Sequence, residues 1–199
     1  MLASFLKKHT DRFKYYDAIT GMSKILRRYF VMNSFDGALT TFGLLLGSFA
    51  AQVDDPLLII QIGIATAIAI GFSGLTGALM TESAERKREI HSMEKALHRK
   101  LDHTDYKKAY DSASTLAAVV DGASPLLASL ILLSPFFFLN ITTAYYVSFG
   151  LALSVFFGLG LFLGKMSREN MFVTGIKLLL TGLLCMAVIL LLENLSSVV

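Results

Sequence analysis

Long apolar segments that are nearly free of charged residues constrain the fold of this chain more than any other feature. Five such runs span residues 35–52, 57–80, 116–139, 144–164 and 172–192. About 20 helical residues cross the roughly 30 Å hydrocarbon core of a bilayer. The runs are continuously apolar, whereas strands of a membrane β-barrel alternate between lipid-facing and lumen-facing residues. The sequence therefore predicts an all-α integral membrane bundle of five transmembrane helices.

Charged residues are few and are concentrated between these runs. They make up 17% of the 199 residues, against about 25% in a typical soluble domain. We expect one membrane domain with five segments. These are an amphipathic cytoplasmic or interfacial N-terminal helix (1–34), transmembrane helices 1 and 2 (35–80), a short cytoplasmic charged helical segment (81–113), transmembrane helices 3 and 4 (114–164), and transmembrane helix 5 with an external C-terminus (165–199).

The distribution of lysine and arginine predicts the orientation. Seven of the 18 precede the first span, eight lie between the second and third spans, and the connection at Asp54–Pro56 has none. Positively charged loops remain in the cytoplasm, so the N-terminus is expected to be cytoplasmic and the C-terminus external. An odd number of spans gives the same answer. We expect a multi-pass protein of the plasma membrane in a prokaryote, or of a vacuole-like organelle in a eukaryote.

The polar segments predict helices outside the membrane. Residues 2–29 are basic and amphipathic, which is typical of a helix lying in the membrane interface; the alternative is a basic tail attracted to anionic lipid. This segment lacks the apolar stretch of a secretory signal, so we expect it to be retained. The second span is expected to continue through Glu82, Glu85 and Glu89. A break near residues 102–104 then precedes a further helix through Tyr110.

A short motif occurs twice at matching positions. Asp36-Gly37-Ala38 begins the first span, and Asp121-Gly122-Ala123 lies near the start of the third. Met80 and Met166 end the hairpins that follow these motifs, at nearly equal spacing. Parallel repeats of this kind occur in transporters, which hold the substrate between the two halves. The alternative is chance similarity among apolar sequences of low diversity.

The two aspartates are the strongest functional candidates. A carboxylate within the membrane costs about 2.5–3.5 kcal/mol on insertion scales, and such residues face the bundle interior or a water-filled path. Gly37 and Gly122 allow a neighbouring backbone or an ion to approach. Asp36 and Asp121 are therefore predicted to hold a cation or a proton. The alternative is that each caps the N-terminus of its helix in the wet interface.

Further side chains have the spacing of metal ligands. Glu82, Glu85 and Glu89 share one helical face, and His91, Glu94 and His98 repeat that spacing on an adjacent face. The thioether of Met80, with a carboxylate, would favour a transition metal over Mg²⁺ or Ca²⁺. The alternatives are a solvated helix with ion pairs and ordinary packing methionines. No motif of nucleophilic catalysis or phosphate binding is present, so we do not expect an enzyme.

The segment Asn33–Gly43, with the sequence NSFDGALTTFG, resembles the first-span signature of the vacuolar iron transporter family. That signature is Asn-Asp-Gly-Leu followed by small and hydroxyl residues. Ser83-Ala84-Glu85-Arg86 resembles the Ser-x-x-Arg stretch where the family's second span leaves the membrane. The resemblance covers about residues 33–192, and only the Asp-Gly segment is specific.

The resemblance implies a homodimer that exports Fe²⁺, and often Mn²⁺, from the cytoplasm in exchange for protons. Asp36 then corresponds to the first-span carboxylate and Met80 to a methionine of the pathway. The acidic cytoplasmic helices, with Glu82, Glu85, Glu89 and Glu94, stand where the family collects metal. We expect no permanently bound cofactor and no nucleic-acid partner.

One departure from the family concerns the second span. The family usually has Gly-Glu-Tyr there, and this chain has Gly77-Ala78-Leu79. Its intramembrane glutamate is therefore missing, with Glu82 nearer the water and Asp121 on the third span as alternative sources of that charge. The departure keeps two other functions open. These are a membrane metal sensor or scaffold that does not transport, and a transporter of another cation or small solute.

Overall fold

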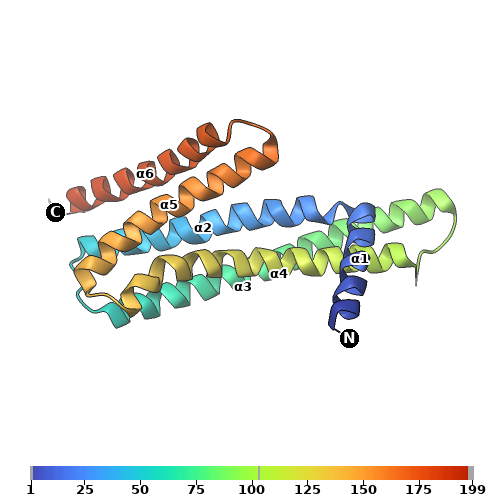
Figure 1. Cartoon of the computed structure of the whole chain (residues 1–199), viewed down its shortest axis with the longest axis horizontal. Coiled ribbons are helices and arrows are strands. Elements are labelled where there is room, and N and C mark those ends of the chain that lie inside the picture. The colour runs from blue at the N-terminus through green and yellow to red at the C-terminus, as the bar shows by residue number, and fades with distance from the viewer. Residues whose placement is uncertain (1, 103, 197–199) are drawn as a thin grey trace. The chain divides into compact units, whose positions relative to one another are not determined.

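The computed structural model describes the backbone of residues 2–102 and 104–196 and the side chains of residues 11–102 and 104–191. Within these ranges the chain is all-helical and contains no strand. The α-helices are α1 (Leu2–Thr20), α2 (Met22–Ala50), α3 (Pro56–Leu97), α4 (Asp105–Leu133), α5 (Ile141–Ser167) and α6 (Met171–Ser196), and the short 3₁₀ helix η1 (Ser134–Phe137) follows α4 (Figure 1). The predicted all-α class is confirmed for the described chain.

Four of these helices are long and apolar enough to cross a membrane, among the residues that are described. They cover Pro56–Leu97, Asp105–Phe137, Ile141–Ser167 and Met171–Leu191. The chain is therefore a multi-pass membrane protein by the length and composition of its helices. The helix predicted as the first span, α2, is not among the four, because Asn33, Ser34 and Asp36 interrupt its apolar sequence. A fifth span remains a prediction.

The single helix predicted over residues 2–29 is wrong, because the chain breaks at Gly21. This glycine has a φ of +62°, in the left-handed region that side chains with a Cβ disfavour. Asp17 accepts a hydrogen bond from the backbone N–H of Ser23 at 2.6 Å and so caps the start of α2. The basic N-terminal segment is thus divided: residues 2–20 form the separate helix α1, and residues 22–29 belong to α2 and are continuous with the predicted first span.

The helix of the second predicted span does extend beyond it, as expected. α3 has 42 residues and includes Glu82, Glu85 and Glu89. The described residues between Leu97 and Asp105 are not helical, in agreement with the predicted break, although His103 itself lies outside the described residues. α4 then runs without interruption from Asp105 into the third apolar run.

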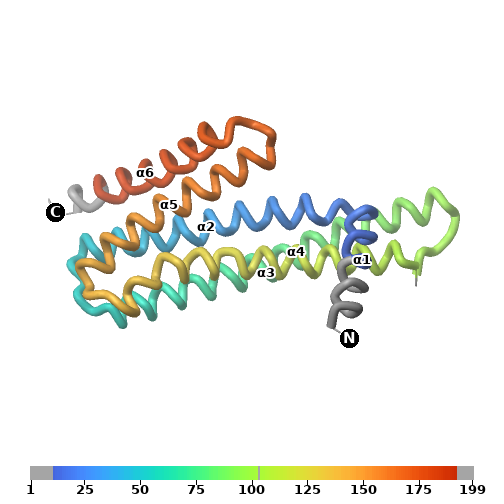
Figure 2. Tube along the Cα trace, viewed as in Figure 1, coloured from blue at the N-terminus to red at the C-terminus, as the bar shows by residue number. Residues whose placement is uncertain are grey.

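The chain forms two compact units, and α2, α3 and α4 each contribute to both. Unit 1 contains the described residues of Met1–Phe30 together with Phe72–Gly122. In this unit the second half of α3 and the first half of α4 run side by side as a hairpin (Figure 2). Unit 2 contains Val31–Gly71 and the described residues of Ala123–Val199.

Unit 2 holds the apolar core. Phe42 of α2 and Phe156 of α5 are fully buried, with ring centroids 5.6 Å apart and nearly perpendicular. α5 and α6 form an antiparallel hairpin (Figure 1), in which a Cβ on Gly160 would lie 2.5 Å from the Cα of Gly175. Small residues therefore allow the two backbones to touch, as is common between helices in lipid.

Candidate functional site

Asp121 lies in the interior of α4 and is almost completely buried. The helix begins at Asp105, so Asp121 is far from its N-terminus and cannot be the capping residue that sequence reasoning left as an alternative. Only 6% of Asp121 is exposed. A Cβ added to Gly74 of α3 would meet Asp121 Oδ2 at 3.0 Å. The absence of a side chain at Gly74 thus makes room for this carboxyl group within unit 1.

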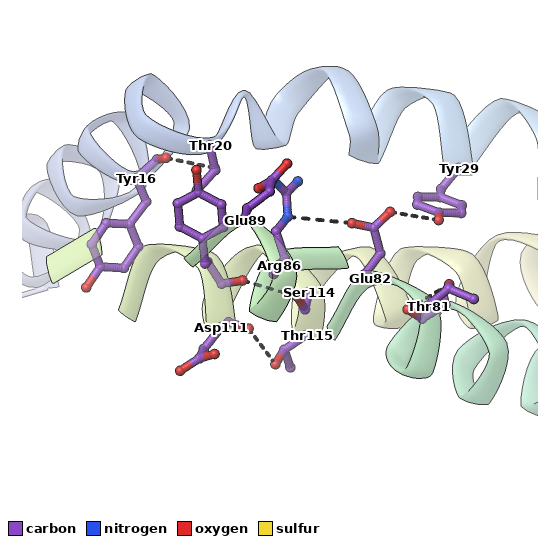
Figure 3. Close-up of polar contacts among 12 residues, drawn as sticks. Tyr16, Thr20, Tyr29, Thr81, Glu82, Arg86, Glu89, Asp111, Ser114 and Thr115 are labelled. Atoms are coloured by element: carbon purple, nitrogen blue, oxygen red, sulfur yellow. Dashed lines mark hydrogen bonds and ion pairs between the residues drawn. The ribbon is translucent and has the colours of Figure 1, made fainter. Parts of the chain in front are cut away.

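Each carboxylate oxygen of Glu82 on α3 has a partner, with a hydrogen bond to one oxygen and a longer ion pair to the other. Tyr29 of α2 donates a hydrogen bond from its phenol to Oε1 at 2.9 Å. Arg86, one helical turn further along α3, places Nε 3.7 Å from Oε2. Figure 3 shows Glu82 between these two side chains. Its side chain is 13% exposed, so this carboxylate sits in a largely water-poor environment and is fixed in direction.

Tyr29 joins Glu82 to α2 through the hydrogen bond that its phenol donates, and Asp121 lies in the same compact unit. Both carboxyl groups belong to unit 1, which also contains Tyr29. The structure thus places two predicted pathway residues in one compact unit, together with a tyrosine that sequence reasoning did not identify.

Arg86 is the second residue that sequence reasoning missed. An arginine on a charged helix is expected to be solvated, yet only 8% of Arg86 is exposed. Its Nη1 donates to Glu89 Oε2 at 2.9 Å, and its guanidinium lies 5.2 Å from the ring centroid of Tyr110 on α4. The signal that could have identified it is the spacing Glu82-Arg86-Glu89, which places both acids on one face with the arginine between them.

The predicted metal ligands further along α3 do not gather in the described chain. Glu85, His91 and His98 are exposed. Glu94 accepts the backbone N–H of Leu101 at 2.8 Å, and its Oε2 lies 4.0 Å from His91 Nδ1. No group of three His, Cys, Asp or Glu side chains that could hold a metal ion occurs among the described residues. A metal role for these residues stays a prediction.

Asp36 lies in unit 2, and its surroundings differ from those of Asp121. It is in the interior of α2, which begins at Met22, so it does not cap that helix. Its side chain is exposed, whereas Gly37 next to it is buried against α4. A Cβ on Gly37 would lie 2.5 Å from Pro125 Cα, and Ser129 donates a hydrogen bond to Gly37 O at 3.2 Å. The absence of a side chain at Gly37 therefore allows the backbones of α2 and α4 to approach closely in unit 2.

The remaining predicted residues are placed as follows. Met80 is 74% exposed on α3 and does not point into either unit. Gly122, the counterpart of Gly37 in the repeat, is buried on α4. Met166, the counterpart of Met80, is half-buried near the end of α5. The two Asp-Gly-Ala motifs thus occupy similar positions, each in the interior of a 29-residue helix.

Comparison with known proteins identifies one informative relative. The chain is 35% identical over 166 residues to a protein described as "Uncharacterized protein MJ0645" from Methanocaldococcus jannaschii. The match covers 81% of this chain and 85% of the archaeal protein. No family model matches the chain. No solved structure matches it significantly. The extent and identity of the match show that this chain belongs to the same protein family as MJ0645.

Proposed function

We propose that this protein is a divergent member of the vacuolar iron transporter family that moves Fe²⁺ or Mn²⁺ out of the cytoplasm in exchange for protons. The observation that carries the proposal is the buried carboxyl group of Asp121, in the interior of an apolar helix and in the same compact unit as the largely buried Glu82. Ionisable residues in membrane-spanning helices are costly and mark ion or proton pathways.

The chemistry of exchange follows from these two carboxyl groups. A carboxylate must lose its proton before it can bind a metal ion, so metal entry releases a proton and protonation releases the metal. Glu82 takes the place of the second-span glutamate that the family usually has, and Asp121 adds a second charge on the neighbouring helix. Fe²⁺ and Mn²⁺ are compatible with oxygen ligands supplied in this way.

In the proposed topology α2 is a fifth span. The N-terminus is then cytoplasmic and the C-terminus external, in agreement with the distribution of Lys and Arg. The polar side chains that lower the hydropathy of α2 are those that a transport path requires. Asp36 belongs to this set.

A homodimer is part of the proposal because two features of the single chain require cover in a bilayer. The Asp36 carboxylate is exposed within a span, which is unfavourable against lipid. α3 also presents an exposed row of small residues at every fourth position, which are Ala65, Ala69, Ser73 and Gly77. Such rows allow close helix–helix contact in membranes. A second copy would cover one or both features.

The test is Mn²⁺ flux into sealed proteoliposomes. Asp121→Asn keeps the shape of the side chain and removes its charge, so flux is expected to fall to the level of empty liposomes. Asp54→Asn is the matched control, because Asp54 is exposed in the connection between α2 and α3, and it should transport like the wild type. Undiminished flux in a folded Asp121→Asn variant would reject the pathway role.

A metal sensor or scaffold is the second candidate function. The exposure of Met80 favours it, because a methionine of a translocation path should be reachable from the interior of the bundle. Wild-type protein that binds Mn²⁺ in detergent and carries none across a sealed vesicle would support the sensor over the transporter.

A further inference from the structure

Arg86 sits between two carboxylates in the region where the transporter is expected to receive its cation. Its Nε is 3.7 Å from Glu82 Oε2 and its Nη1 is 2.9 Å from Glu89 Oε2. The three residues lie on one face of α3, and the side chain of Arg86 is 9% exposed. A positive charge on the chain itself is therefore already shared between two of the acids predicted to collect metal.

The pairing between Arg86 and Glu82 is incomplete. The buried Nε of Arg86 has no hydrogen-bond partner among the described residues, and its distance to Glu82 is too long for a hydrogen bond. A buried donor without a partner is unfavourable by roughly 1–3 kcal/mol. The other oxygen of Glu82 is well satisfied by Tyr29. Glu82 is thus oriented by the tyrosine and only loosely paired with the arginine.

We propose that the guanidinium of Arg86 is an intrinsic counter-cation of Glu82 and Glu89, and that a divalent cation binding at these carboxylates must displace it. The inference rests on the proposed function, because it assumes that a divalent cation reaches this end of α3. Arg86 would lower the negative charge of the site between cations and weaken cation binding, so that the ion can be released.

Charge and space both allow the displacement. A divalent cation carries twice the charge of a guanidinium and prefers carboxylate oxygens. Glu82 and Glu89 are seven residues apart, or about 10 Å along the helix axis, so the ion would contact one carboxylate directly and the other through water. A cavity of about 500 Å³ borders Arg86, and Lys87, His91 and Glu94 also line it. The displaced side chain can move into this space.

The contact with Tyr110 gives Arg86 a binding partner that does not depend on the two carboxylates. The guanidinium already lies over the aromatic ring of Tyr110 at 5.2 Å from its centroid, and cation–π attraction persists after the ion pairs are broken. Arg86 can therefore release the two carboxylates without losing all of its partners.

The experiment measures Mn²⁺ binding to the full chain in detergent by isothermal titration calorimetry. Arg86→Gln removes the competing charge, and the Kd for Mn²⁺ should fall by about tenfold or more, since a unit charge a few Å away is worth at least that much at a partly buried site. Arg88→Gln is the matched control. It removes the same charge from an exposed position two residues away, and its Kd should equal that of the wild type.

A second variant keeps the inference testable if Arg86→Gln does not fold. Arg86→Lys retains a positive charge and loses the planar fork, so its Kd should lie between those of the wild type and Arg86→Gln. If the variant that retains the wild-type circular dichroism spectrum binds Mn²⁺ no more tightly than wild type, Arg86 is only a structural ion pair and the inference is overturned. Because binding is measured in detergent and transport in sealed vesicles, tighter binding without flux would reject the transporter and leave the inference standing.

Discussion

Gly37 determines how closely α2 and α4 approach in unit 2. A Cβ at this residue would lie 2.5 Å from both Cα and O of Pro125, which are backbone atoms that cannot rotate away. We expect Gly37→Ala to separate the two helices and to destabilise the protein by about 1–3 kcal/mol. Gly47→Ala is the control: Gly47 lies on the same helix as Gly37, and a Cβ added there would meet nothing within 4 Å. Thermal unfolding in detergent compares the two variants, and an unchanged midpoint for Gly37→Ala would contradict the packing described.

Some of the residues of the candidate site could be predicted from the sequence alone. Asp36 and Asp121 stand out because a charge is rare in an apolar run, and both lie inside their helices as the functional prediction requires. The burial of Asp121 and the exposure of Asp36 could not be predicted, because they depend on which face of each helix meets a neighbour. Tyr29 gave no signal of its own, since a tyrosine is ordinary at the edge of a membrane span, and the only signal for Arg86 was its spacing from Glu82 and Glu89.

At the scale of elements, the break between α1 and α2 depends on a local cap. Hydrogen bonding from the side chain and backbone of Ser23 lowers the pKa of Asp17 below its ordinary value. A carboxyl group with a lowered pKa stabilises the folded state at neutral pH, and this contribution disappears as the pH falls through the folded-state pKa. The break should therefore be strengthened by an ionised Asp17.

The prediction for this element compares two aspartates of α1. Asp17→Ala should destabilise the protein by about 1 kcal/mol at neutral pH, as loss of a helix cap typically does. The difference from wild type should vanish at a pH below the folded-state pKa of Asp17. Asp11→Ala, at an exposed residue of the same helix, should have little effect at either pH. Equal melting curves for Asp17→Ala and wild type at neutral pH would show that the cap is unimportant.

The helices and the break near residues 102–104 were largely predictable, and the break at Gly21 was not. The second span continues through Glu82, Glu85 and Glu89 because these residues favour helix and no glycine or proline intervenes. A single glycine in a basic amphipathic segment, such as Gly21, does not by itself specify a residue with left-handed backbone geometry. Pro125 lies inside α4 without ending it. The role of Pro125 depends on the neighbouring helix, because its backbone packs against Gly37 of α2.

At the scale of the whole molecule, the open question is whether α2 crosses the membrane. Cysteine labelling in intact cells with an impermeant maleimide answers it, after Cys185→Ser removes the single native cysteine. The proposed topology predicts that Asp54→Cys is labelled from outside, and that Arg99→Cys and Glu169→Cys react only after permeabilisation. All three substitutions lie in connections between helices. Protection of Asp54→Cys in intact cells would mean that α2 does not span in the proposed direction.

The central claim is an exchange of divalent metal for protons, and it is tested most directly by measuring both ions in one experiment. Wild-type protein is reconstituted into liposomes that contain a pH-sensitive dye, and Mn²⁺ is added outside. The account predicts that Mn²⁺ entry is accompanied by alkalinisation of the liposome interior. It also predicts that Mn²⁺ enters faster when the interior is made more acidic than the outside. Mn²⁺ entry that leaves the internal pH unchanged and ignores the gradient would contradict proton exchange, and the absence of any Mn²⁺ entry would contradict transport itself.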